Sequence, residues 1–181
     1  EVVAIVGGTG SGKTTIANLL TRFYDVESGR ITINGVDIRK MKQSKLRSFT
    51  GYAPQKALLF TGTIRENLQY GKPDATDEEM WCALEIAQAA DFISELTNGL
   101  DSLVEQGGGN FSGGQRQRLN IARAIVSKAD IMIFDDSFSA LDFKTEVKLR
   151  KALIPEIRSS VFLIISQRIS SFIQSYTIIV L

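Results

Sequence analysis

The residues with the clearest chemical potential form the sequence GGTGSGKT, Gly7 to Thr14, which follows a short apolar run and precedes an amphipathic stretch. The spacing G-x-x-x-x-G-K-[ST] between a strand and a helix is typical of a loop that wraps phosphate oxygens. Its glycines let backbone N–H groups turn inward, and the helix adds its positive end. Lys13 can supply a point charge to the outer phosphates, and the Thr14 hydroxyl can ligate Mg²⁺. An ordinary glycine turn is the alternative, but a chance match is below about one in a hundred for a chain of this length.

Two adjacent carboxylates, Asp135 and Asp136, follow the apolar run Ile131–Phe134. An apolar run this short, bounded by acids, predicts a buried strand that delivers charge to its end. Beside a phosphate loop, the first acid can hold Mg²⁺ through water. The alternative role for Asp135 is to cap the next turn. We therefore expect these acids to lie close to the phosphate loop.

The sequence FSGGQRQR opens a helix that we predict over Ser112–Ser127. Ser112 and Gln115 have capping-box spacing, while Gly113 and Gly114 permit close backbone approach. Hydrogen-bond donors gather there at a positive helix end, so this segment is a second candidate anion site. A plain helix start is the alternative, because S-x-x-Q alone is common. The Gly-Gly pair and the phosphate loop earlier in the chain favour the anion site.

These groups need a scaffold of strands and helices. Short apolar runs predict strands at Val2–Val6, Phe49–Ala53, Ile131–Phe134, Val161–Ser166 and Thr177–Leu181. Helical patterns occur at Lys13–Tyr24, Thr76–Leu96, Ser112–Ser127 and Lys144–Leu153. Their alternation predicts an α/β fold around a mostly parallel sheet. The segment Ile31–Ile38 alternates around Asn34-Gly35 and predicts an antiparallel hairpin.

The bulk composition is that of an ordinary globular chain. With 181 residues, 44% of them hydrophobic, it can bury one sizeable core, so we expect a single domain over 1–181. A net charge of +1 gives no argument for a nucleic-acid partner. The single cysteine, Cys82, is typical of a reducing cytosol, and we interpret it as a packing or interface residue. Both ends fall within apolar runs, so we expect a fragment truncated at both ends.

The chain resembles the ATP-binding-cassette (ABC) family. The most specific motif is S-G-G-Q followed by basic residues, and the order of the other motifs matches too: phosphate loop, YAPQ with Gln55, this signature, IMIFDD, and SALD with Asp142. The resemblance covers essentially all 181 residues. It implies a P-loop NTPase (RecA-like) parallel sheet, an ABC-type helical subdomain near residues 56–127 and a partial antiparallel β subdomain. The family's adenine-stacking aromatic would lie before Glu1.

In that family two such domains pair head to tail, and each ATP lies between one phosphate loop and the partner's signature helix. The resemblance therefore implies that Ser112, Gly113, Gly114 and Gln115 serve a partner's nucleotide, and that Asp142 takes part in dimer communication. It implies ATP and Mg²⁺ as cofactors, with Thr14, Gln55 and Asp135 as metal ligands. The nucleotide-binding residues that it implies are Gly7, Thr9, Gly10, Ser11, Gly12, Lys13, Thr14, Thr15 and Gln55.

The segment LFTGTIRENLQYG, Leu59–Gly71, looks like the family's exporter branch, in which this loop contacts helices of the membrane domain. From the residues alone it offers only Thr63 as a helix cap, with Glu66 at the third helical position. The exporter branch implies a transmembrane domain, which we expect in the same polypeptide, and a location at the cytoplasmic face of the cell membrane. The loop before the signature departs from the exporter pattern at Gln106 and Gly107.

Two catalytic positions also depart from the family pattern. Asp136 stands where glutamate is usual, which withdraws the carboxylate by roughly 1.5 Å, one C–C bond. A misplacement of about 1 Å can cost ~10²-fold in rate. Gln167 precedes Arg168 where a switch histidine is usual, and glutamine cannot titrate or take a positive charge. Drift with retained activity is the alternative for each change alone, but together they predict a site that binds ATP and hydrolyses it poorly.

We therefore expect the ATP-binding domain of an ABC exporter, from the degenerate half of a heterodimeric, multidrug-type pair. Its own site would turn over slowly, and its signature would complete the partner's hydrolytic site, so the pair is a transport-coupled ATPase. One alternative is a regulatory nucleotide-gating domain of a channel- or receptor-type ABC protein. A soluble ABC ATPase of translation or DNA repair is another, against which Leu59–Gly71 and the near-neutral charge argue. Small P-loop kinases and GTPases fit worse, since neither explains the signature helix.

Overall fold

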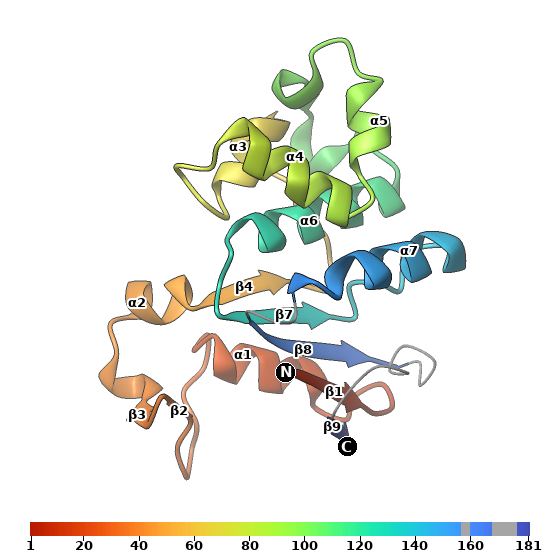
Figure 1. Ribbon diagram of the computed structural model, residues 1–181. Coiled ribbons are helices and arrows are strands. Elements are labelled where there is room, and N and C mark those ends of the chain that lie inside the picture. Colours follow the sequence, from red (N-terminus) through yellow and green to blue (C-terminus); the bar gives the residue numbers. More distant parts are fainter. Residues whose placement is uncertain (157–159, 168–176) are drawn as a thin grey trace.

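The computed structural model describes residues 1–156, 160–167 and 177–181, and a five-stranded sheet forms its centre (Figure 1). The strand order is β4-β7-β8-β1-β9, and every neighbouring pair is parallel. The strands are β1 (Val2–Val6), β4 (Thr50–Ala53), β7 (Ile131–Asp135), β8 (Val161–Ser166) and β9 (Thr177–Val180). The predicted α/β fold with a parallel sheet is confirmed.

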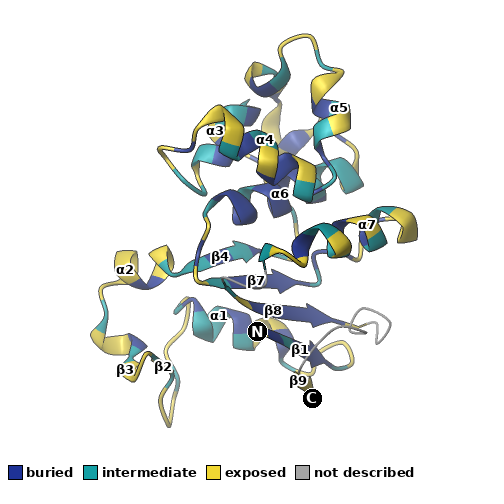
Figure 2. Cartoon of the chain, in the orientation of Figure 1, coloured by how far each residue is buried: buried dark blue, intermediate teal, exposed yellow. Residues whose placement is uncertain are grey.

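The two faces of the sheet carry separate clusters of buried side chains, as expected from the period of two along a strand. On one face, Ile5 and Ile133 pack against Ala17 of α1 (Lys13–Leu20). On the other face, Ala4 and Phe134 join a larger core that includes side chains of α6 (Gly113–Val126) and α7 (Phe143–Leu153). The central strands are accordingly almost entirely buried (Figure 2).

Three further helices lie on the far side of α6 from the sheet, at the top of Figure 1. They are α3 (Ile64–Gln69), α4 (Asp77–Ile86) and α5 (Ala90–Ser94). Their buried side chains, among them Met80 and Leu84, belong to the same large core as the sheet. The predicted cap at Thr63 is confirmed, because Thr63 and Glu66 form a complete capping box at the start of α3.

Two predicted helices are shorter than expected. The single helix predicted over Thr76–Leu96 is wrong: Gln88 adopts φ 60°, a left-handed conformation that separates α4 from α5. The helix predicted to reach Tyr24 ends at Leu20 because Arg22 adopts φ 54°. Neither break has a glycine or proline to announce it.

Short elements complete the fold. The predicted hairpin is confirmed as β2 (Thr32–Ile33) paired with β3 (Val36–Asp37). A second antiparallel pair, β5 (Gly62–Thr63) with β6 (Leu103–Val104), and the helix α2 (Gln43–Ser48) were not predicted. Single turns of 3₁₀ helix lie at Ile38–Lys40, Gly99–Asp101 and Gln106–Gly108. Across the described segments, no helix combines the length and apolarity needed to cross a bilayer.

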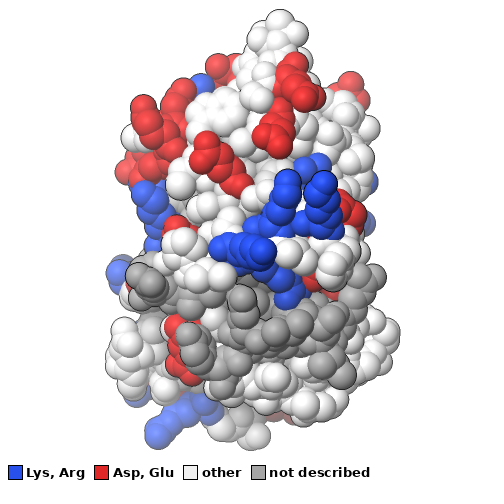
Figure 3. Space-filling model, turned by 45° about the vertical axis from the view of Figure 1, so that its right-hand side comes forward, with Lys and Arg blue, Asp and Glu red and all other residues white. Residues whose placement is uncertain are grey.

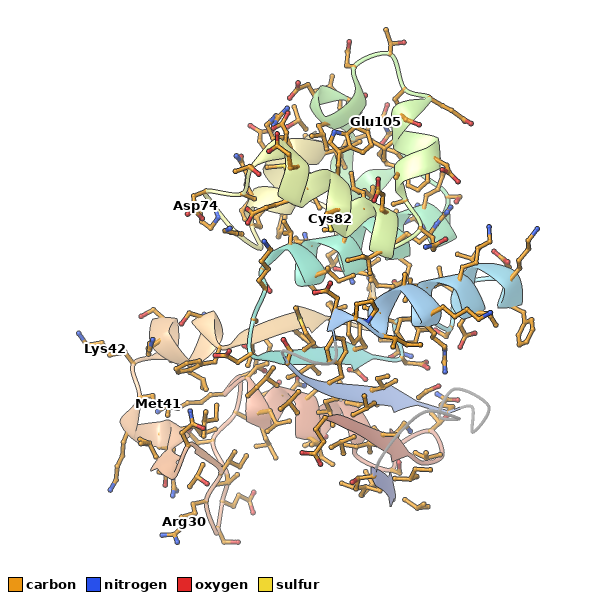
Figure 4. The ribbon with its side chains drawn as sticks, in the orientation of Figure 1. Arg30, Met41, Lys42, Asp74, Cys82 and Glu105 are labelled. Atoms are coloured by element: carbon orange, nitrogen blue, oxygen red, sulfur yellow. The ribbon has the colours of Figure 1, made fainter. Side chains whose placement is uncertain are left out.

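Two of the side chains labelled in Figure 4 lie at the surface. Lys42 is exposed just before α2. Cys82 is exposed on α4, which excludes the packing role and leaves the interface role as a prediction.

Candidate functional site

The carboxyl ends of β1, β4, β7 and β8 meet at one edge of the sheet because these strands are parallel. The phosphate loop follows β1, Gln55 follows β4, Asp136 follows β7 and Gln167 follows β8. A cavity of about 250 Å³ opens at this edge. Its lining consists of Thr9, Gly10, Gly12, Lys13, Thr14, Thr15, Gln55, Asp135, Asp136 and Gln167. Segments far apart in sequence are therefore brought together as a single site.

The phosphate loop owes its shape to glycine. Gly10 has φ 83° and Gly12 has φ 95°, a region that side-chain-bearing residues rarely adopt, and Gly12 is the residue from which α1 begins. Gly7 and Ser11 belong to the same loop but do not line the cavity, and a Cβ at Gly7 would collide with the Ser11 hydroxyl. The loop thus presents the N-terminus of α1 to the cavity, which favours an anion.

Lys13 adds a buried positive charge to this loop. Its side chain donates from Nζ to the carbonyl oxygens of Gly7 at 2.8 Å and Gly8 at 2.6 Å, and the residue is only 7% exposed. Within the described parts of the chain, Lys13 forms no ion pair. A buried ammonium that is not ion-paired is costly, so an anionic ligand would be stabilising at this position.

Asp135 lines the same cavity as the loop and is only 1% exposed. The Thr14 hydroxyl donates to its Oδ1 at 3.3 Å, and the Tyr52 hydroxyl donates to its Oδ2 at 3.3 Å. Burial raises the pKa of Asp135, and these two hydrogen bonds partly oppose the rise. Burial, followed by the charge of Asp135, raises the pKa of Tyr52. A hydroxyl and a carboxylate side by side are hard oxygen ligands, so this donor set fits Mg²⁺.

The second acid, Asp136, has an unusual backbone. It adopts φ 46°, which Asp tolerates better than most residues, and its amide donates to the Ile165 carbonyl at 2.8 Å. Gln55 donates from Nε2 to Asp136 Oδ2 at 3.2 Å, so the short carboxylate is tied to the residue that follows β4. Gln167 is exposed at the end of β8, whereas Arg168 lies outside the described residues.

The predicted signature residues lie away from the cavity lining, at the start of α6. Ser112 and Gln115 form the expected capping box: the Gln115 amide donates to Ser112 Oγ at 3.2 Å, and the Ser112 amide donates to Gln115 Oε1 at 2.9 Å. A Cβ added at Gly113 would meet only Arg116 Nη2, at 3.9 Å, whereas one at Gly114 would meet the Ala140 carbonyl at 3.4 Å. The helix start is therefore open at Gly113.

The body of α6 is attached to the strand that leads to Gln55. The side-chain amides of Gln117 and Asn120 both donate to the Pro54 carbonyl, at 3.4 and 3.3 Å. Under the same helix, Gly51 of β4 has no room for a side chain, because a Cβ there would meet the Ala124 carbonyl at 2.8 Å. Helix and strand are thus in close contact along this seam.

The start of α6, the start of α7 and the carboxyl edge of the sheet all face the right-hand side of Figure 1. Asp142 caps α7 by accepting a hydrogen bond from the Thr145 amide at 3.0 Å, which lowers the pKa of Asp142. Figure 3 turns this side forward and shows Lys and Arg gathered across its middle. Such a positive surface attracts anions.

One contact in this site escaped sequence reasoning. Tyr52 lies within a strand that was predicted correctly, but the alternation of side chains along β4 does not reveal that its hydroxyl reaches Asp135 on the neighbouring strand. Only the register of β4 against β7 could have indicated it.

Comparison with known proteins decides the family, since the model of the ABC transporter family matches residues 1–139. The chain belongs to the ABC transporter family. Family membership implies that its nucleotide is ATP and that the chain is an ATP-binding domain.

Relatives that match nearly the whole chain include an uncharacterised ABC protein, a lipid flippase and a channel subunit. It is 46% identical over 180 residues to an uncharacterised ABC transporter ATP-binding protein of Mycobacterium tuberculosis, covering 98% of this chain and 31% of the relative. An ATP-dependent lipid A-core flippase of Desulfotalea psychrophila is 43% identical, with 99% and 32% covered. A mitochondrial potassium channel ATP-binding subunit of Mus musculus is 42% identical, with 100% and 25% covered.

The solved structure of a bacterial Atm1-family ABC exporter with ATP bound superposes with a TM-score of 0.94 at 42% identity, covering 99% of this chain and 31% of that chain. The ABC chain described here therefore spans a third or less of the length of these relatives.

Proposed function

We propose that this chain is the ATP-binding domain of an ABC exporter and the degenerate member of a heterodimeric pair. The observation that carries the proposal is the composition of one cavity. Its phosphate loop and its magnesium-type oxygen ligands are intact, while Asp136 and Gln167 occupy the two positions that we expect to lie nearest the reacting phosphate. Such a site would hold ATP for long periods and cleave it slowly.

The binding half of the mechanism follows from the loop and from Asp135. Backbone N–H groups at the start of α1 and the Lys13 ammonium would hold the phosphates, and Thr14, Gln55 and Asp135 would hold Mg²⁺. Mg²⁺, when bound there, would neutralise part of the charge on the phosphates. Lys13 would exchange its two carbonyl partners for phosphate oxygens, which are stronger acceptors.

The catalytic half of the proposed mechanism is weak for one geometric reason and one electrostatic reason. Asp136 is one methylene shorter than glutamate, and its carboxylate accepts a hydrogen bond from Gln55, so it points at an amide donor. Gln167 can donate a hydrogen bond but carries no positive charge to the outer phosphate. The attacking water would therefore lack both a well-placed base and a cation beside it.

The signature helix would serve the partner domain. Ser112–Gln115 lie outside the chain's own cavity, and Gly113 faces open space at a helix N-terminus. In a head-to-tail pair, this N-terminus would contact the nucleotide held by the partner's phosphate loop, with Asp142 close to the shared interface. The partner's site would then carry out most of the hydrolysis.

A groove of about 420 Å³ supports contact with a membrane domain, which we propose to belong to the same polypeptide. Its wall includes the exposed rings of Phe60 and Tyr70, which are 48% and 65% exposed and whose centroids lie 4.6 Å apart. Arg123 lies over the Phe60 ring at 5.5 Å. Exposed aromatic and arginine side chains are common at interfaces, and this contact would place the chain at the cytoplasmic face of the membrane.

A second candidate is a nucleotide-gating domain of a channel-type protein, favoured by the 42% identity to the mouse channel subunit. The cavity would bind ATP in the same way. The two functions differ in their output: vesicles containing the full-length protein would show ATP-dependent ion conductance in one case and ATP-dependent movement of an organic substrate in the other.

Photolabelling tests the principal proposal. The full-length pair is loaded with 8-azido-ATP and magnesium, chased with unlabelled ATP, and the nucleotide on each subunit is identified. We expect intact triphosphate on this chain and diphosphate on the partner, with the first signal lost in Lys13→Ala and kept in the surface control Lys148→Ala. Prompt diphosphate on this chain while the partner's pocket is blocked would refute the degenerate site.

A further inference from the structure

Asp135 is held by two hydroxyl groups from opposite sides. Thr14, at the start of α1, donates to Oδ1, and Tyr52, on the neighbouring strand β4, donates to Oδ2, both at 3.3 Å. In the register of the sheet, Tyr52 lies opposite Ile133, two residues before Asp135. One donor on each oxygen fixes both the position and the rotation of a carboxylate, which one donor alone would leave free to turn.

The Tyr52 ring is itself held by packing. It is partly buried against the cluster of Ile5, Ile133 and Ala17 between the sheet and α1. The Phe23 ring lies 6.4 Å away from it at an angle of 52°, a tilted aromatic contact. A tyrosine side chain has few rotatable bonds, so a ring held in this way delivers its hydroxyl to a defined point.

We propose that Tyr52 is a positioning residue that orients Asp135 for magnesium. The proposal rests on the function argued above, because it presumes that this cavity binds ATP with a divalent cation. Tyr52 precedes Gln55 by three residues, so its hydroxyl also ties the strand that carries one expected magnesium ligand to the strand that carries another.

Removing the hydroxyl alone tests this role. Hydrogen bonds that orient a metal ligand are typically worth 10–100-fold in metal affinity. In the full-length protein, 8-azido-ATP labelling of this subunit is titrated with Mg²⁺ at fixed nucleotide and repeated in EDTA. We expect Tyr52→Phe to raise the half-maximal magnesium concentration by about 10-fold and to leave the EDTA labelling unchanged.

Two further variants separate positioning from packing. Tyr24→Phe removes a hydroxyl from a tyrosine that is 65% exposed, and this variant should titrate like the original protein. Phe23→Leu keeps the Tyr52 hydroxyl but loosens its ring, and should give a smaller shift in the same direction. Equal half-maximal magnesium in Tyr52→Phe and the original protein would overturn the proposal, as would an equal loss of labelling with and without magnesium. Absence of labelling in the unchanged protein would instead refute ATP binding itself.

Discussion

Lengthening the second acid is the sharpest test of the degenerate site. Asp136→Glu advances the carboxylate by roughly 1.5 Å, and correcting a misplacement of about 1 Å is worth up to ~10²-fold in rate, or about 2.7 kcal/mol. The left-handed backbone at residue 136 suits aspartate better than glutamate, at a cost of about 1 kcal/mol. Gln167 still offers no charge. We therefore expect Asp136→Glu alone to raise the hydrolysis rate of this pocket about 10-fold. Asp136→Glu combined with Gln167→His should raise it ~10²-fold.

The assay is single-turnover ATP hydrolysis by the full-length pair, with the partner's own catalytic acid replaced so that only this pocket reports. Asp136→Asn is the matched control, because it keeps the length and removes the charge; we expect the slow rate to change less than about 3-fold, since a misplaced base contributes little. A loss of 100-fold in Asp136→Asn, or no gain in the double variant, would show that Asp136 already acts as an effective base.

Two other changes probe the partner site and the fold. Gly113→Val fills open space in this chain, so its own unfolding temperature should stay within about 2 °C while turnover at the partner's site falls by about 100-fold; unchanged turnover would place the signature away from the partner's nucleotide. Glu79 accepts hydrogen bonds from Lys128 and Lys72, which lower its pKa from 4.5 to about 2. Because the pKa of the Glu79 carboxyl is lowered, the stability that its ion pairs contribute is fully present above pH 4.5 and is lost as the pH falls toward 2. In urea unfolding, Glu79→Gln should therefore be less stable than the original protein at neutral pH and equal to it near pH 2; a difference independent of pH would contradict the ion-pair account.

The carboxyl edge of the sheet, where the cavity lies, was predicted well because the sequence patterns that indicate it are local. A phosphate loop needs glycine at left-handed positions, and Gly10 and Gly12 occupy such positions. Buried parallel strands are short apolar runs, so β7 and β8 were located within a residue. Parallel strands then place Gln55 and Asp135 at a common edge by topology alone.

The parts that sequence reasoning missed depend on tertiary context. Gln88 adopts a left-handed conformation in the middle of a good helical pattern, and no local rule anticipates it. The β5–β6 pair joins Gly62–Thr63 to Leu103–Val104, two dipeptides too short to show alternation. The Tyr52–Asp135 contact requires the register of two strands that are distant in sequence. Roles that involve a second domain, such as those of Asp142 and the signature, remain predictions.

In the proposed pair of domains, the contact between α6 and β4 has a consequence for communication between the two nucleotide sites. The Pro54 carbonyl accepts two amide hydrogen bonds from the middle of α6, and Gly51 packs against the end of α6 without room for a side chain. Close-packed interiors transmit displacement because they compress little. A displacement of the N-terminal end of this helix by the neighbouring domain's nucleotide would therefore be transmitted through the rigid helix to the peptide just before Gln55. Each pocket would then respond to the occupancy of the other without a separate relay.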